Sequence, residues 1–328
     1  MHDLSISPTP LLRVENLRVH FPVQRSSLSK PEAWVRAVED VSFTLGAGET
    51  LGLLGESGCG KTTLGRAVLR LGPVTAGTIR YGGTDITRLE GRVLREHRRQ
   101  FQMIFQDPFS SLNPRFTVGQ IVGEPLEIHR LVKDSTARDR RIGELLESVG
   151  LDSRLADRFP HEFSGGQRQR IGIARALAVE PQLIVCDEPV SALDVSVQAQ
   201  VVNLLQDLQK QRGLAYLFIS HDLAVVEHLA HRILVMYLGQ VLEEAPASVL
   251  CQKPLHPYTQ ALVSAIPTVD PASKRRRIVL SGEPPSPLSP PTGCPFHPRC
   301  PMVQPRCRIE APVLRNLGDG RRVACHQV

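Results

Sequence analysis

The segment LGLLGESGCGKTT, residues 51–63, carries the strongest structural signal in the chain. Its apolar start predicts a buried strand, and the pattern G-x-x-x-x-G-K-[ST] follows at residues 55–62, with a helix expected to begin near Lys61. Glycines let backbone N–H groups close on an anion, and a helix N-terminus adds the positive end of its dipole. The segment therefore predicts a loop that binds a nucleoside triphosphate.

Two side chains of this loop have specific roles in the prediction. Lys61 can reach the terminal phosphates and is also a catalytic candidate, and the Thr62 hydroxyl can ligate Mg²⁺. The expected ATP-binding residues of the loop are Gly55, Glu56, Ser57, Gly58, Cys59, Gly60, Lys61, Thr62 and Thr63.

The composition is that of a globular protein. The chain has 328 residues, 41% hydrophobic and 22% charged, which is enough for one large α/β domain with an appendage or for two modest domains. No run approaches the ~18 apolar residues needed to span a bilayer, and the N-terminus lacks the apolar segment of a signal peptide. We therefore expect a cytosolic chain without disulfides. The net charge of +6 admits nucleic acid or an anionic membrane surface as partners.

The N-terminal part predicts an antiparallel layer beside the phosphate loop. Residues 11–22 alternate between apolar and polar and are predicted as an edge strand, residues 35–45 as a second strand, and residues 78–81 as part of a hairpin. Phe21 either stacks on a nucleotide base or packs in the core.

A second glycine-lined helix start follows a helical segment. Residues 101–106 predict a strand, and residues 107–163 a mostly helical insertion. Ser164 and Gln167 have the spacing of a capping box, which predicts a helix that runs to about Ala178.

Three polar side chains follow two buried strands. Residues 182–186 lead to Asp187 and Glu188, which suit Mg²⁺ coordination and polarisation of the attacking water. Residues 214–220 lead to His221, which would emerge at the same sheet edge and contact the γ-phosphate.

The ordered motifs GESGCGKT, FQDP, FSGGQ, LIVCDEP, SALD and SHD resemble the nucleotide-binding domain of ABC transporters over about residues 11–250. The resemblance implies an α/β fold: an ABC-type P-loop NTPase with a RecA-like core, an antiparallel β-subdomain and a helical insertion at about 107–163. It implies that Gln106 senses Mg²⁺ and the attacking water, and that His221 is the switch histidine. The other positions that it implies are the signature residues that touch a partner's ATP, and an aspartate that follows: Ser164, Gly165, Gly166, Gln167 and Asp194.

The count of phosphate-binding elements agrees with this implication. Two helix ends could cradle phosphates, but only one carries a lysine-bearing loop. ATP would then be held between two such domains, and closure of the pair would exclude water.

The C-terminal part, residues 251–328, resembles the extension of oligopeptide/dipeptide importer ATPases, in particular the second, F-type ATPase. The resemblance rests on KPLHPYTQAL at residues 253–262, where Lys253 replaces the usual asparagine, and on SGEPPSP at residues 281–287. It implies a heterodimer with a sister ABC ATPase at the cytoplasmic face of the inner membrane. Two transmembrane permeases, fed by an extracytoplasmic peptide-binding protein, would insert coupling helices near residues 106–114.

Four cysteines crowd this Pro-rich extension with the spacing C-x5-C-x6-C-x17-C. The spacing does not fit the short first pair of most zinc sites, and Cys-Pro is common at iron–sulfur ligands. Zinc and unligated thiols remain alternatives. The resemblance implies a [4Fe–4S] cluster held by Cys294, Cys300, Cys307 and Cys325.

The sequence thus predicts an ATPase that powers peptide import, with ATP and Mg²⁺ as ligands. Closely related ATPases serve importers of nickel or other small solutes, so that cargo class is an alternative. A soluble ABC ATPase acting on nucleic acid or ribosomes is disfavoured, because this chain has one domain and an H-P-Y tail, and we expect no nucleic-acid partner.

Overall fold

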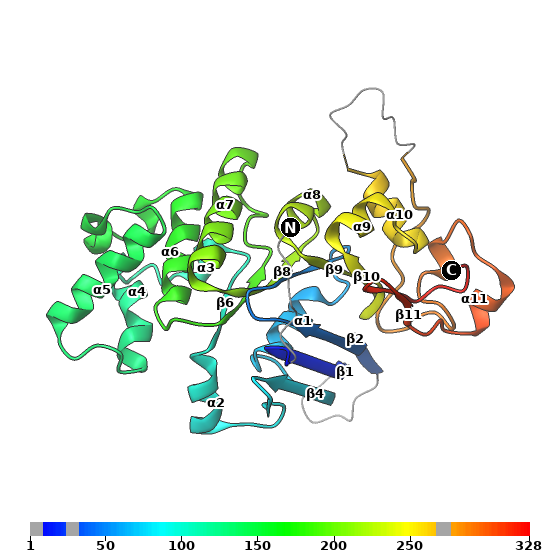
Figure 1. Ribbon diagram of the computed structural model, residues 1–328, viewed down its shortest axis with the longest axis horizontal. Coiled ribbons are helices and arrows are strands. Elements are labelled where there is room, and N and C mark those ends of the chain that lie inside the picture. The colour runs from blue at the N-terminus through cyan, green and yellow to red at the C-terminus, as the bar shows by residue number, and fades with distance from the viewer. Residues whose placement is uncertain (1–8, 24–32, 267–276) are drawn as a thin grey trace. The chain divides into compact units, whose positions relative to one another are not determined.

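The computed structural model describes residues 9–23, 33–266 and 277–328 (Figure 1). The described residues form two compact units. The helical unit comprises residues 46–49 and 88–219, and the phosphate-loop unit comprises the described residues of 9–45, 50–87 and 220–328.

The helical unit contains a parallel sheet. β6 (Phe101–Ile104) pairs with β7 (Leu183–Asp187), and β7 pairs with β8 (Ala215–Ser220) with Asp187 opposite Ile219. Every residue of β7 and β8 is buried, as is typical of parallel strands covered on both faces.

Only helices and loops lie between β6 and the start of α6. Helix α4 packs on α5 and on α6, and Figure 1 shows the three side by side. The helices of this unit are α2 (Gly91–Arg98), α3 (Pro108–Ser111), α4 (Val118–Ile128), α5 (Ser135–Ser148), η1 (Ser153–Asp157), η2 (Pro160–Glu162), α6 (Gly165–Leu177) and α7 (Val195–Arg212).

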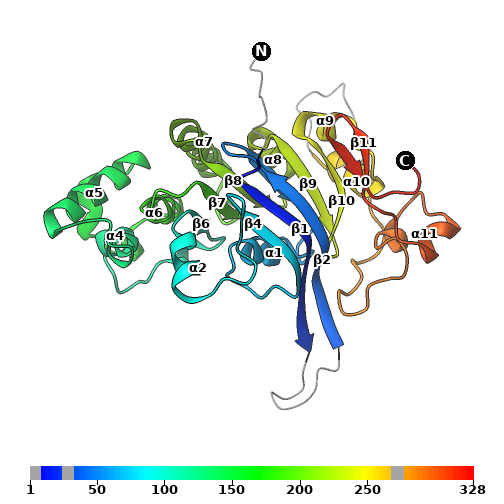
Figure 2. The same ribbon diagram turned by 60° about the horizontal axis from the view of Figure 1, so that its bottom comes forward.

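An antiparallel layer opens the phosphate-loop unit. Its strands are β1 (Leu12–Val23), β2 (Ala33–Leu45), β4 (Ala76–Tyr81) and β5 (Thr84–Asp85), in the order β2-β1-β4-β5. Figure 2 shows β2, β1 and β4 side by side. The prediction of β1 as an edge strand is wrong, because β1 pairs with both β2 and β4. Alternating polarity reports one buried face of a strand, but not how many neighbours the strand has.

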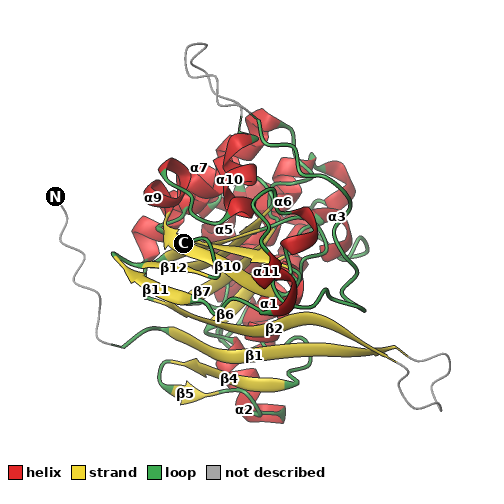
Figure 3. Cartoon of the chain, turned by 90° about the vertical axis from the view of Figure 1, so that its right-hand side faces the viewer, coloured by secondary structure: helices red, strands yellow, loops and turns green. Residues whose placement is uncertain are grey.

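The rest of this unit is built around β3 (Thr50–Leu54), which pairs in parallel with β9 (Arg232–Tyr237). Beyond β9 the sheet continues with β10 (Gln240–Pro246), β12 (Arg321–Val323) and β11 (Arg315–Gly318), and Figure 3 shows these C-terminal strands. Buried Glu244 of β10 forms ion pairs with Arg232 and Arg322, which tie the last hairpin to the sheet.

The helices of the phosphate-loop unit are short. None of the helices in the described ranges is both long enough and apolar enough to cross a membrane. In this unit they are α1 (Lys61–Val68), α8 (Leu223–Leu229), α9 (Ala247–Gln252), α10 (Pro257–Ser264), η3 (His297–Arg299) and α11 (Pro305–Ile309).

Candidate functional site: the phosphate loop and the motif residues

The phosphate loop joins β3 to α1, as the sequence predicts. At Gly60 the backbone has φ +103°, and an added Cβ would lie 2.0 Å from the Ala37 carbonyl oxygen, so only glycine fits. No side chain caps the N-terminus of α1 among the described residues. The positive end of this helix is therefore suited to an anion.

Lys61 lies across this loop and is 4% exposed. Its Nζ donates hydrogen bonds to the carbonyl oxygens of Gly55 at 2.8 Å and Glu56 at 3.0 Å. Burial raises the pKa of the neighbouring Cys59 thiol, although the Lys61 charge opposes the shift. Ser57 and Gly58 are exposed at the tip of the loop.

Two catalytic candidates, Glu188 and Gln106, lie together at the end of β7, beside the predicted metal ligand Asp187. Asp187 is 1% exposed, and the Glu188 N–H that follows it donates to the Ile219 carbonyl oxygen at 3.0 Å. The Glu188 backbone is left-handed, with φ +45°, a conformation that is uncommon for non-glycine residues and is found at functional sites. Gln106 donates from Nε2 to Glu188 Oε2 at 3.0 Å.

The predicted capping box is confirmed at the start of α6. The Ser164 hydroxyl accepts from the Gln167 N–H, and the Gln167 side chain accepts from the Ser164 N–H. Gly166 allows α7 to approach, because an added Cβ would lie 2.4 Å from a methyl carbon of Val197. Asp194 caps α7, and its pKa is lowered because the Ser196 hydroxyl and the Val197 N–H donate to it.

The remaining predicted residues lie in the phosphate-loop unit. His221 follows β8 and is exposed, and Asp222 beside it caps α8. Phe21 is 37% exposed on β1, so the alternative that it packs in the core is wrong. Stacking of Phe21 on a nucleotide base stays a prediction.

Two arginines of α6 that sequence reasoning missed hold the segment after Gln106. The Arg168 guanidinium lies 4.1 Å from the centre of the Phe109 ring, and Arg175 Nη1 donates to the Ser111 carbonyl oxygen at 2.6 Å. Their spacing of seven residues, two turns of one helix face, was an available signal. These contacts connect α3 to α6.

The four C-terminal cysteines share one neighbourhood. Burial raises the pKa of Cys294 to about 11, and the thiols of Cys300, Cys307 and Cys325 add to this shift. The Cys294 N–H also donates to the Cys307 carbonyl oxygen at 2.8 Å. Across the described ranges, however, no three or more His, Cys, Asp or Glu side chains are grouped closely enough to hold a metal ion. Cysteine thiolates are suitable ligands for zinc or an iron–sulfur cluster. In this structure, however, the described side chains are not arranged to coordinate a metal ion.

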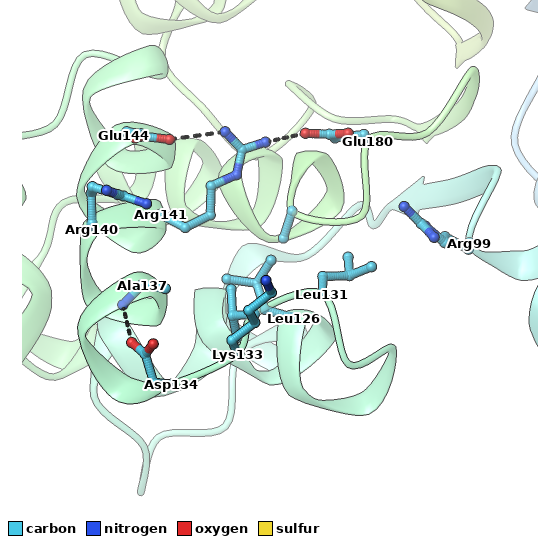
Figure 4. Close-up of a pocket in the computed structure, with 12 residues that line it drawn as sticks. Arg99, Leu126, Leu131, Lys133, Asp134, Ala137, Arg140, Arg141, Glu144 and Glu180 are labelled. Carbon is cyan, nitrogen blue, oxygen red and sulfur yellow. Dashed lines mark hydrogen bonds and ion pairs between the residues drawn. The ribbon is translucent and has the colours of Figure 1, made fainter.

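A separate hollow of about 480 Å³ lies in the helical unit between α4, α5 and the end of α6 (Figure 4). Arg141 crosses one side of it and forms ion pairs with Glu144 at 3.0 Å and Glu180 at 2.5 Å. Asp134, another lining residue, caps α5 through the Ala137 N–H. These carboxylates already hold α5 and the turn after α6 in place, and we assign the hollow no ligand.

Comparison with known proteins identifies two matching families and several relatives of this chain. The family described as "ABC transporter" matches residues 38–191, and the family described as "Oligopeptide/dipeptide transporter, C-terminal region" matches residues 242–307. The "Probable peptide ABC transporter ATP-binding protein y4tS" of Sinorhizobium fredii is 55% identical over 96% of this chain and 89% of its own length. The "Oligopeptide transport ATP-binding protein AppF" of Bacillus subtilis is 50% identical over 96% of this chain and 97% of its own.

A solved structure shows the same cassette fold. The ATP-binding cassette MJ0796, in a dimeric post-hydrolysis state bound to ADP and Pi, superposes with a TM-score of 0.64. It is 28% identical and covers 72% of this chain and 98% of its own.

The fold and the ordered motifs therefore define an ABC-type ATPase. The chain belongs to the ATP-binding subunits of ABC transporters, in the oligopeptide/dipeptide branch, and is an ATPase of the peptide-transporter type. ATPases of this family work with membrane permease components.

Proposed function

We propose that ATP hydrolysis by this chain powers peptide import and that the residues described above carry it out. Lys61 and the loop N–H groups bind the phosphates, and Thr62 ligates Mg²⁺. Glu188 polarises the attacking water, and His221 contacts the γ-phosphate. The observation that carries the proposal is the hydrogen bond from Gln106 to Glu188 at the end of a buried strand.

The metal ligands belong to the same proposal. Asp187, the last residue of the buried strand β7, and Gln106 would hold the Mg²⁺ that neutralises phosphate charge. The names of the relatives favour peptides over nickel or other small solutes as cargo, and a transporter over an ATPase acting on nucleic acid.

The second part of the proposal concerns a sister ATPase subunit. Ser164 is exposed at the N-terminus of α6, and Gly166 fixes that end against α7. The cassette MJ0796 forms a dimer, which supports pairing of two such domains. In the arrangement that we propose, each ATP contacts the phosphate loop of one subunit and the Ser164 end of the other. We propose a heterodimer of this kind.

Replacing Ser164 with arginine tests the heterodimer. The larger cation would block closure on the sister's nucleotide, so ATPase activity of the pair is expected to fall by roughly tenfold or more. ATP affinity of this chain alone is expected to stay unchanged, since its own phosphate loop is untouched. Steady-state hydrolysis and equilibrium binding measure the two effects. Ser135→Arg, at an exposed position on α5, is the matched control. Full activity of Ser164→Arg with its sister would contradict the arrangement.

The surface after Gln106 supports docking on the permeases. Phe109 is 60% exposed on α3. Phe116 and Phe159 are also exposed, and a hydrogen bond from Val118 N–H to the Arg158 carbonyl oxygen joins the two segments to which they belong. Aromatic side chains are enriched at protein-binding surfaces. We propose that coupling helices of two transmembrane permeases dock here, at the cytoplasmic face of the inner membrane, with an extracytoplasmic peptide-binding protein delivering the cargo.

We also propose that the four cysteines hold a [4Fe–4S] cluster, with zinc as the alternative. Thiolates are the ligands of both, so the raised thiol pKa values would have to be overcome by the metal. When bound, either centre would cross-link a Pro-rich segment that has little apolar content of its own.

Anaerobic purification of the full chain with iron, sulfide and zinc analysis tests this metal centre. A cluster predicts about four irons and a broad absorption band near about 400 nm. Both should be lost in Cys300→Ser but kept in Cys251→Ser, which changes a buried cysteine outside the set. About one zinc in a colourless protein would support the alternative. Absence of both metals from the anaerobic protein would contradict the proposal.

A further inference from the structure

The described part of the C-terminal segment, residues 251–328, contacts the phosphate loop at Glu56. Arg299 donates from Nη1 to Glu56 Oε2 at 2.7 Å and from Nη2 to Oε1 at 3.1 Å, although 243 residues separate the two. Their side chains are only 8% and 29% exposed. This is a two-pronged, largely buried ion pair, a geometry that fixes direction as well as distance.

The backbone of Glu56 is held from the same segment. Its N–H donates to the hydroxyl oxygen of Tyr258, in α10, at 2.9 Å. Tyr258 is fully buried. The phosphate loop is therefore fixed at Glu56 through both the side chain and the main chain.

An aromatic cluster anchors both contacts. Phe296 is fully buried, its ring centre 5.3 Å from that of Tyr258 and 5.4 Å from that of Tyr237, which it meets edge to face. Tyr237 ends β9, the strand paired with the strand that leads into the loop. The His256 ring lies 5.6 Å from Phe296, and burial lowers the pKa of His256 to about 3. The cluster is thus a buried aromatic support for the residues that reach Glu56.

Arg299 lies in the four-cysteine segment, residues 294–325, and its position depends on the fold of that segment. It ends the short turn η3, between Cys294 and Cys300. The hydrogen bond from Cys294 N–H to the Cys307 carbonyl folds the segment back on itself. The position of the guanidinium is therefore determined by how this segment is folded.

Glu56 in turn contacts the lysine of the loop. The Glu56 carbonyl oxygen accepts one of the two hydrogen bonds from Lys61 Nζ. A shift of Glu56 would therefore move a group that holds the ammonium, and would alter the loop that receives the phosphates.

We propose that Arg299 and Tyr258 are positioning residues of the phosphate loop, through which the four-cysteine segment sets nucleotide affinity. The inference rests on the proposed role of the loop in ATP binding and adds a control of that loop from the other end of the chain. Neither residue touches the nucleotide in this proposal.

The test measures Mg²⁺-dependent binding of the fluorescent analogue mant-ATP to the full chain. Arg299→Gln is expected to weaken binding by roughly tenfold, as expected for loss of hydrogen bonds between charged groups. Glu56→Gln should give a similar loss of affinity. The double variant should bind mant-ATP as well as either single variant, because each substitution removes the same ion pair. Arg306→Gln is the matched control, since it removes an exposed ion pair with Glu310 from the same segment and should bind like the parent.

Two further variants keep the test decisive. Tyr258→Phe removes only the hydroxyl and keeps the buried ring, so the variant should fold. Its affinity for mant-ATP should nevertheless be roughly threefold lower than that of the parent. Arg299→Lys, which offers one prong, should recover part of the affinity. Parent affinity in both Arg299→Gln and Tyr258→Phe, or additive losses in the double variant, would overturn the inference. Lys61→Ala in the same assay separates this inference from the proposed role of the loop in ATP binding. Parent affinity in Lys61→Ala would contradict that role.

Discussion

Glu188→Gln is expected to lower kcat for ATP hydrolysis by roughly 10²- to 10⁴-fold and to leave the Kd for ATP unchanged. Glutamine has nearly the same shape, so the left-handed backbone and the hydrogen bond to the Ile219 carbonyl can persist. What is lost is the carboxylate that accepts from Gln106 and, in the proposed mechanism, polarises the attacking water. Phosphate release under saturating Mg–ATP and equilibrium binding measure the two quantities.

Glu180→Gln is a matched control for this prediction. Glu180 also has a left-handed backbone, with φ +54°, and its exposed carboxylate pairs with Arg141 away from the motif residues. It should hydrolyse ATP like the parent. If Glu188→Gln also turned over within about twofold of the parent rate, the assignment of the general base would be wrong.

Lys61→Ala is expected to weaken ATP binding itself, by roughly 10²-fold. Lys61 is buried and is the one Lys or Arg in the loop sequence, residues 55–63. Hydrogen bonds to charged groups contribute about 1.5–3 kcal/mol each. Its removal also frees the carbonyl oxygens of Gly55 and Glu56 that it now holds. Calorimetric titration of the full chain with Mg–ATP measures the loss.

The control for this variant is Lys210→Ala, which removes an exposed lysine from the last turn of α7. It should bind ATP like the parent. An unchanged affinity in Lys61→Ala, with the protein folded by circular dichroism, would contradict the phosphate-loop assignment.

Local patterns predicted the parts of the site that local physics determines. The capping box of Ser164 and Gln167 is a contact over three residues, and the strand before Glu188 is a continuous apolar run. Both could be predicted because the residues that form the feature are neighbours in sequence.

Contacts between distant segments could not be predicted in this way. No periodicity links Arg299 to Glu56, since each belongs to a different motif and their pairing depends on how the C-terminal segment folds back. The edge position assigned to β1 failed for a related reason, because strand order is set by the partners and not by the strand's own alternation. The cysteine spacing indicated donor chemistry but could not show how the thiols are arranged.

Uptake of a labelled oligopeptide by cells whose own copy of this chain is replaced by Glu188→Gln tests the central claim most directly. The expected result is loss of energy-dependent uptake at an unchanged level of the protein, with parental uptake in cells that carry Glu180→Gln. Uptake at the parental rate in the Glu188→Gln cells would contradict the claim that ATP hydrolysis by this chain powers peptide import.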